Sequence, residues 1–241
     1  MRLKARGEAV IVSMPTYSDV VGVLGAGKKS EEMPVLLAVI GDIVGNFQVI
    51  KALLTVIGEA GIETIAHTGN TVGDTGGNRA IIRILQEYDL VWVQGLQDRQ
   101  TVRIERKAAS LRKRMDEAAC AAMRRAHASL SSADLEILRR LPPQRQLELD
   151  GVRVLACHGA PSGQRVQVDA DTPQTWLQRE REIAPVDIIV CGGSAAPFHR
   201  WVDGALFVGP GRADCGAGHA AYTVISTEDD SWSVHHLEIT Y

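Results

Sequence analysis

The chain contains one stretch that predicts its architecture, Val35-Leu-Leu-Ala-Val-Ile-Gly-Asp-Ile-Val-Gly-Asn46. It begins with a continuous apolar run, as expected of a strand that is covered on both faces. Glycine and aspartate end the run, and apolar residues then recur at helical spacing from Phe47 to Ile57, with Gly61 as a stop signal. A strand, a polar loop and a helix in this order indicate a parallel sheet with helical crossovers.

The same alternation continues along the chain. We expect further strands at 64–67, 90–93, 146–149, 152–157, 186–191, 205–208, 221–226 and 232–239. We expect helices at 79–87, 99–128, 131–141 and 174–183. These elements favour an α/β fold of two sheets with outer helices, and any site should lie in the loops after the carboxyl ends of the strands.

Residues 1–33 do not share this pattern, and we interpret them as an N-terminal extension to a domain at 34–241. Within the extension, Gly22-Val-Leu-Gly-Ala-Gly-Lys-Lys-Ser30 is similar to a phosphate-binding loop. Lys29 occupies the position of the magnesium-binding hydroxyl, and the chain then meets Pro34 instead of entering a helix. The sequence therefore argues against nucleotide binding at this motif.

The composition excludes several classes of partner. The 241 residues carry a formal net charge of -3 with acids and bases interspersed, which gives no electrostatic footprint for nucleic acid or an anionic membrane. No apolar run reaches the roughly 20 residues that span a bilayer, and the residue order of a signal peptide is missing. We expect a cytoplasmic protein that binds neither nucleic acid nor membrane.

The loops after the strands carry a series of short motifs. They are Gly41-Asp-Ile-Val44, Gly69-Asn-Thr-Val-Gly73, Gly95-Leu-Gln-Asp98, His158-Gly-Ala-Pro161, Gly192-Gly-Ser-Ala195 and Gly209-Pro-Gly-Arg212. As an ordered set, the series resembles the motifs of the calcineurin-like metallophosphoesterases, particularly the small bacterial and archaeal branch, over roughly residues 35–241. The resemblance implies a four-layer αββα sandwich of two mixed sheets, with a two-metal site that hydrolyses phosphate esters.

Several of the family's metal ligands are missing from this chain. Val44, Gly193 and Ala195 stand where the resemblance implies histidine ligands, and Leu96 stands where it implies an asparagine ligand. None of these side chains offers an electron pair to a metal ion. The resemblance therefore implies a degenerate member of the family, which keeps the catalytic scaffold but has lost most of its ligands.

Two polar replacements weaken the site further. Asn70 matches the carboxylate that bridges the two metal ions, and a neutral amide with one acceptor oxygen cannot offset their repulsion. Gln97 matches the histidine that donates to the phosphate, and glutamine does not change its protonation state near neutral pH. Asp98, which in the family orients that histidine, is retained without its partner.

Only Asp42 and His158 match metal ligands unchanged, with Asn70 as a weakened third. A catalytic cation typically needs about three protein ligands. We therefore expect no bound cofactor and a protein that is catalytically impaired. The surviving polar set of Asp42, Asn70, Gln97, Asp98 and His158 is then inherited scaffold.

Two arginines point to a ligand for such a scaffold. Arg99 directly follows the third motif, and Arg212 stands at the serine of the family's Asn-Pro-Gly-Ser turn. If both side chains point inward, their guanidinium groups could bind a phosphate or carboxylate where the metals would lie. We expect the protein to bind a small anion such as a phosphate-containing ligand, or a protein partner, at this cleft. Homo-oligomers are a further expectation, by analogy with other members of the fold.

The alternative is an active metal-dependent phosphoesterase that hydrolyses phosphomonoesters or phosphodiesters. It would hold manganese or another divalent metal with an unorthodox set of ligands, recruited from outside the family positions. The sequence offers His67, Asp74, His199 and His219 for that role.

Overall fold

The computed structural model describes residues 36–112, 115–228 and 231–241. The predicted extension at 1–33, with its motif at 22–30, lies outside these ranges. Within them, no helix is long and apolar enough to cross a bilayer.

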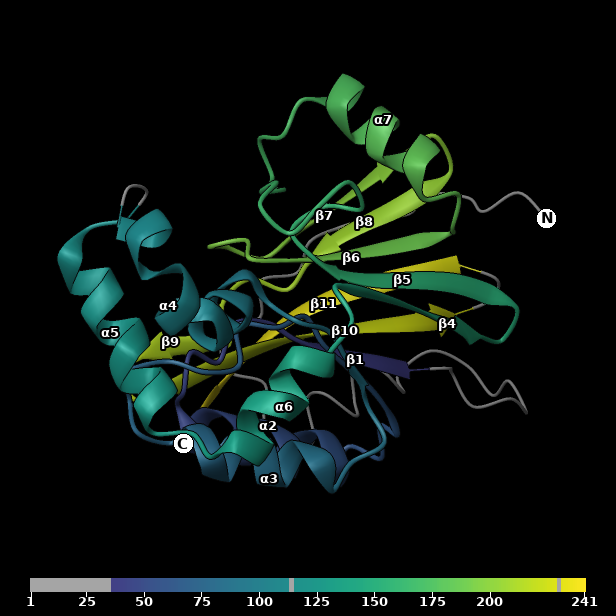
Figure 1. Cartoon of the computed structure of the whole chain (residues 1–241). Coiled ribbons are helices and arrows are strands. Elements are labelled where there is room, and N and C mark those ends of the chain that lie inside the picture. The colour runs from purple at the N-terminus through teal and green to yellow at the C-terminus, as the bar shows by residue number, and fades with distance from the viewer. Residues whose placement is uncertain (1–35, 113–114, 229–230) are drawn as a thin grey trace.

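Two β-sheets stack face to face between outer helices, which confirms the four-layer sandwich (Figure 1). The first sheet contains β1 (Leu36–Ile40), β2 (Thr64–His67), β3 (Val91–Trp92), β9 (Asp214–Gly216), β10 (His219–Glu228) and β11 (Ser231–Thr240). Its order is β11-β10-β1-β2-β3, with β9 paired to β10. The second sheet contains β4 (Gln144–Leu149), β5 (Val152–His158), β6 (Ile188–Gly192), β7 (Phe198–Val202) and β8 (Ala205–Gly209), in the order β4-β5-β6-β8-β7.

Both sheets are mixed. Strands β1, β2 and β3 are parallel to one another, as are β5, β6 and β8, while β10, β11, β4 and β7 pair antiparallel. Because the carboxyl ends of parallel strands share one edge of a sheet, the loops after them gather there. The motif loops follow these strands.

Helices cover the outer faces of both sheets. They are α2 (Phe47–Glu59), α3 (Asn78–Gln86), α6 (Ser132–Arg140) and α7 (Gln174–Ile183). In Figure 1, α2, α3 and α6 lie below the first sheet and α7 lies above the second. Residues Ala38 and Ile40 of β1 pack toward α2 and α3, whereas Leu37 and Val39 pack between the two sheets. The continuous apolar run thus fills two separate layers of the core, as expected of a strand covered on both faces.

The prediction of one helix over 99–128 is wrong. The structure has α4 (Leu96–Arg112) and α5 (Glu117–Ala128), which pack against each other through Ile104 and Met123. Helix α5 begins anew because the Asp116 carboxylate caps it, with Oδ1 accepting from the Ala119 N–H over 2.7 Å. We call α4 and α5 together the α4–α5 hairpin, which projects beside the sheets in Figure 1.

Candidate functional site

The motif loops of the two sheets meet at one site. The loop after β8 joins the loop after β1, since the Ala213 N–H donates to the Asp42 carbonyl over 3.0 Å. The loop after β5 joins the loop after β2, since His158 Nδ1 lies 2.8 Å from the Thr68 carbonyl. Gly41 and Gly95 permit close approach of the loops, because a Cβ at these positions would overlap the backbones of Gly211 and Asn70, respectively. The family positions that the sequence placed at separate strand ends are therefore neighbours.

Asp42 and Asn70 form the centre of this site. Asn70 Nδ2 donates to Asp42 Oδ2 over 2.8 Å, and Asn70 Oδ1 accepts from the Gln97 backbone N–H over 2.8 Å. A backbone N–H can only donate, so the second hydrogen bond fixes which side of the amide faces Gln97. The amino group of Asn70 therefore faces the carboxylate, and the Asn70 oxygen is already engaged.

The Asp42 carboxylate is only partly satisfied. It is 9% exposed, and its buried Oδ1 has no hydrogen-bond partner of normal geometry. Burial raises the pKa of Asp42 above its ordinary value, against the opposing effects of His158, the Asn70 amide and Arg212. The site thus holds a carboxylate that lacks full compensation for its charge.

His158 presents one free ring nitrogen to the same site. The Thr68 carbonyl can only accept a hydrogen bond, so Nδ1 carries the proton. In the neutral ring Nε2 then has a lone pair, and it has no hydrogen-bond partner among the described residues. A Cβ at Gly193, where the family pattern implies histidine, would lie 3.3 Å from this nitrogen. The histidine that is lost at position 193 would therefore stand beside the one that is kept.

Asp98 and Gln97 hold loops together. The buried Asp98 accepts hydrogen bonds from the backbone N–H groups of Val72 (3.0 Å) and Gly95 (2.9 Å), and burial raises its pKa despite these bonds. Gln97 Nε2 donates to the Val72 carbonyl over 3.0 Å. Both side chains tie the start of α4 to the loop after β2, so Asp98 has a structural task without a histidine partner.

The remaining family positions supply no donor. Val44 is half-buried with a left-handed backbone (φ 51), Leu96 begins α4, Gly193 forms a tight turn and Ala195 is exposed. Within the described ranges, no three histidine, cysteine, aspartate or glutamate side chains are grouped to hold a metal ion. Two dications would need more protein ligands, and more negative charge among them, than these loops provide.

The four donors that the alternative would recruit are engaged elsewhere. His67 is fully buried, with Nδ1 3.2 Å from the Ile40 carbonyl and Nε2 2.9 Å from Thr71 Oγ1, and burial lowers its pKa to about 4. Asp74 forms an ion pair with Arg125 (2.5 Å), His199 lies at hydrogen-bond distance from His236 (3.3 Å), and His219 contacts the Glu238 carboxylate (2.8 Å). None of the four lines the pocket between the motif loops and the α4–α5 hairpin.

The two predicted arginines occupy different surroundings. Arg212 is exposed, and its positive charge lowers the pKa of Asp42 by favouring the ionised carboxylate. Arg99 is half-buried and donates from Nη1 to Gln164 Oε1 over 3.0 Å. Burial lowers the pKa of Arg99, and the charges of Arg103 and Arg165 lower it further. The structure thus adds Arg165 to the site, while Arg103 lies exposed nearby. The only indication of Arg165 in the sequence is weak, namely that it lies in the loop that follows His158.

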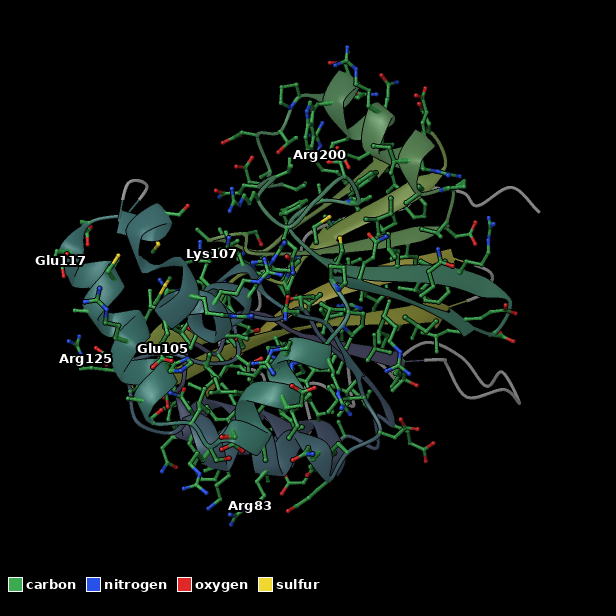
Figure 2. All side chains as sticks on the ribbon, in the orientation of Figure 1. Arg83, Glu105, Lys107, Glu117, Arg125 and Arg200 are labelled. Atoms are coloured by element: carbon green, nitrogen blue, oxygen red, sulfur yellow. The ribbon has the colours of Figure 1, made fainter. Side chains whose placement is uncertain are left out.

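A pocket of about 300 Å³ lies between the motif loops and the α4–α5 hairpin. A bidentate ion pair between Arg125 and Asp74 fastens the hairpin to the loop after β2, and Figure 2 shows Arg125 on α5. Asn78 Nδ2 adds a hydrogen bond of 2.9 Å to Ser129 Oγ at the end of α5. The lining side chains include Asn70, Leu96, Gln97, Gln100, Met115, Met123, His158, Gln164, Arg165, Val166 and Gln167.

Comparisons with known proteins agree with this architecture. The profile of the calcineurin-like phosphoesterase superfamily domain matches residues 35–230. A crystal structure of a hypothetical protein from Pyrococcus horikoshii OT3 is similar over 86% of this chain and 88% of that chain, with 19% identity and a TM-score of 0.73. A metallophosphoesterase from Sphaerobacter thermophilus is similar over 86% and 89%, with 17% identity and a TM-score of 0.63. A search of curated proteins gave no match. At these identities the solved structures show the fold alone.

Proposed function

The chain belongs to the calcineurin-like phosphoesterase superfamily, and on that premise we propose that it is a catalytically impaired member, which binds a small anion in the pocket without paired metal ions. The proposal separates the fold, which the chain keeps, from the hydrolytic chemistry, for which it lacks the ligands.

One observation carries this proposal: the hydrogen bond from Asn70 Nδ2 to Asp42. In a two-metal centre, a bridging carboxylate uses anionic oxygens to hold both cations. Here the Asn70 amino group occupies the space beside the Asp42 carboxylate and partly satisfies it. Turning the amide over would break the hydrogen bond from Gln97 and place two oxygens against each other, so the present orientation is the favourable one.

The charge near the pocket supports an anionic ligand. Arg165 lines the pocket, and Arg99 donates a hydrogen bond to Gln164, which also lines the pocket. In a cleft that excludes part of the water, guanidinium groups bind phosphate and carboxylate strongly and with defined geometry. Arginines can therefore provide the positive charge that metal ions provide in other members of the family.

A specific observation also favours the alternative of metal-dependent hydrolysis. Asp42 Oδ1 has no hydrogen-bond partner of normal geometry, and His158, whose Nε2 makes no hydrogen bond with the described residues, lines the pocket. These two donors could hold one divalent cation, with water completing its coordination. Such an ion would have one carboxylate and one imidazole from the protein, below the number that catalytic sites normally use.

The two functions differ in their response to chelation. We would treat the purified full chain with EDTA, measure its metal content, and titrate it with inorganic phosphate by calorimetry. Phosphate should bind to the metal-free protein, and adding manganese should leave the affinity unchanged. The variant Arg99→Gln should weaken binding about tenfold, while Arg83→Gln, a matched change on the outer side of α3, should not.

Hydrolysis is measured on the same samples. With manganese present, an aryl phosphate should release no phenol above the uncatalysed rate. Binding of phosphate only to the manganese-loaded protein would overturn metal-free anion binding, and hydrolysis that depended on manganese and on Asp42 would make the chain an active phosphoesterase.

A further inference from the structure

We propose that the ligand of this pocket is an organic anion with an aromatic body, whose charged group binds Arg99 and Arg165, with the exposed Arg103 adding positive charge nearby, and whose ring packs against the α4–α5 hairpin. This inference rests on the proposed function and defines the chemical class of its ligand. The site lies beside the remnant metal loops, and the arginines and methionines that it uses lie outside the family motifs.

The three arginines form a cluster of positive charge without carboxylate partners. Arg99 is partly buried, and the charges of Arg103 and Arg165 lower its pKa. Its one side-chain hydrogen bond with the described residues goes to the neutral amide of Gln164. Within the described ranges, none of the three takes part in an ion pair. Like charges brought together in this way repel one another, and an anion bound between them would remove that cost.

The anion should lie at these arginines and not at the position of the family's metals. Without metal ions, the Asp42 carboxylate would repel a phosphate or carboxylate placed directly over it. The pocket extends from His158 and Asn70 to Arg165, so a ligand can bind beside Asp42 without contacting it. His158 Nε2 then lies on the pocket side as an acceptor for a polar group of the ligand.

The opposite wall is apolar and contains two methionines. Met115 precedes α5, Met123 lies within it, and both pack with Ile104 of α4. Met115 and Met123 also line the pocket, as does Leu96. A methionine thioether makes favourable contacts with aromatic rings and adapts to their shape. This wall therefore suits a flat apolar group better than a hydrated inorganic ion.

Size and hydrogen bonding limit the ligand further. A volume of about 300 Å³ lies at the lower end for small-molecule sites, so one ring and one charged group fit better than a large cofactor. The amides of Gln100 and Gln167 line the pocket and make no side-chain hydrogen bond with the described residues. They can contact polar substituents at the edge of the ring.

Calorimetry with matched anions tests this inference. The EDTA-treated full chain would be titrated with inorganic phosphate, phenyl phosphate, acetate and benzoate. We expect each aromatic anion to bind at least about tenfold more tightly than its non-aromatic counterpart. The tighter of phenyl phosphate and benzoate identifies the charged group, and assay of free phenol confirms that phenyl phosphate stays intact.

Variants at the half-exposed Met115 and the exposed Arg165 distinguish binding of the aromatic ring from binding of the charged group. Met115→Gln should lower the preference for phenyl phosphate over phosphate toward one and leave phosphate affinity unchanged. Arg165→Gln should weaken both ligands about tenfold. The control Arg83→Gln should change neither, because Arg83 projects from α3 at the lower edge of Figure 2, away from the hairpin.

Failure of this inference is distinguishable from failure of the proposed function. Equal affinity for phosphate and phenyl phosphate, or a preference that Met115→Gln does not change, would overturn the aromatic class while metal-free anion binding stands. Absence of binding by all four anions would overturn both.

Discussion

Asn70 directs the amino side of its amide at Asp42 and donates to the carboxylate over 2.8 Å, while the Gln97 backbone holds the other side of the amide. The two residues come from the loops after β1 and β2, on neighbouring strands. The hydrogen bond therefore closes the space between two strand ends where the family pattern implies a bridged pair of cations. Because Asn70 stands where the family pattern implies a carboxylate, the site has one negative charge fewer, and the amide donates to the charge that remains on Asp42.

Changing Asn70 to aspartate tests this link. In Asn70→Asp a second carboxylate faces Asp42 at hydrogen-bond distance, and like charges in a buried site disfavour the folded state. We expect the free energy of unfolding at pH 7 to fall by about 2 kcal/mol in urea denaturation, with a smaller loss in acid, where one carboxyl group is protonated.

The matched control for this change is Asn70→Gly. Asn70 has a left-handed backbone (φ 54), which glycine tolerates, and glycine removes the two side-chain hydrogen bonds without adding charge. Asn70→Gly should lose stability with a weaker dependence on pH than Asn70→Asp, because it removes the amide that stabilises the ionised Asp42 but adds no second carboxylate. If the two variants showed the same pH dependence, repulsion from Asp42 would not be the cause.

Asp42 itself should make stability depend on pH. Burial raises its pKa in the folded protein above the ordinary 3.8, so the folded state binds the proton more tightly than the unfolded state. The stability that this proton provides is fully present below pH 3.8 and is lost as the pH rises through the folded pKa. We expect Asp42→Asn to remove this part of the decline.

The measurement is urea denaturation of both proteins across the acid range. The buried Asp98 also has a raised pKa and titrates in both proteins, so the difference between them isolates Asp42. The stability of the wild-type protein relative to Asp42→Asn should rise toward acid; a difference that stayed constant with pH, or that moved against the wild type toward acid, would contradict the raised pKa of Asp42.

Asp98 should prove to be a structural residue. Its two oxygens accept from the Val72 and Gly95 N–H groups, and in Asp98→Asn one of these donors would face an amino group. A buried donor without an acceptor costs about 1–3 kcal/mol, so thermal unfolding should occur at a clearly lower temperature. Unchanged stability together with lost phosphate binding would assign Asp98 to the ligand site instead.

The sequence predicted the layers of this fold because burial leaves a regular trace. Alternate residues of β1 fill two cores, so its apolar run is continuous. Strand β7 left no such trace, since it lies at a sheet edge and carries the half-buried His199 and Arg200 between buried Phe198 and Val202. The break before α5 was missed because residues with high helix propensity lie on both sides of Asp116, and a single capping hydrogen bond marks the new start.

The site was predictable only in part. Missing donors at Val44, Leu96, Gly193 and Ala195 follow from side-chain chemistry alone. The orientation of the Asn70 amide depends on a backbone N–H from another loop, and the hydrogen bond of Arg99 to Gln164, beside Arg165, depends on how α4 packs against the loop after β5. Such contacts between distant segments have no local signal in the sequence.

Val44 occupies its position at a cost in backbone strain. Its φ of 51 lies in the left-handed region, which β-branched residues rarely adopt, and the loop is held there because the Val44 and Gly45 N–H groups donate to the Asn70 and Thr71 carbonyls, each over 2.9 Å. Asparagine tolerates this conformation far better. We therefore expect Val44→Asn to raise the free energy of unfolding by about 1 kcal/mol in urea denaturation. Val44→Thr keeps the branched Cβ and should give no such gain, so equal stabilisation by both variants would show that the side-chain environment, and not the backbone, sets the stability at this position.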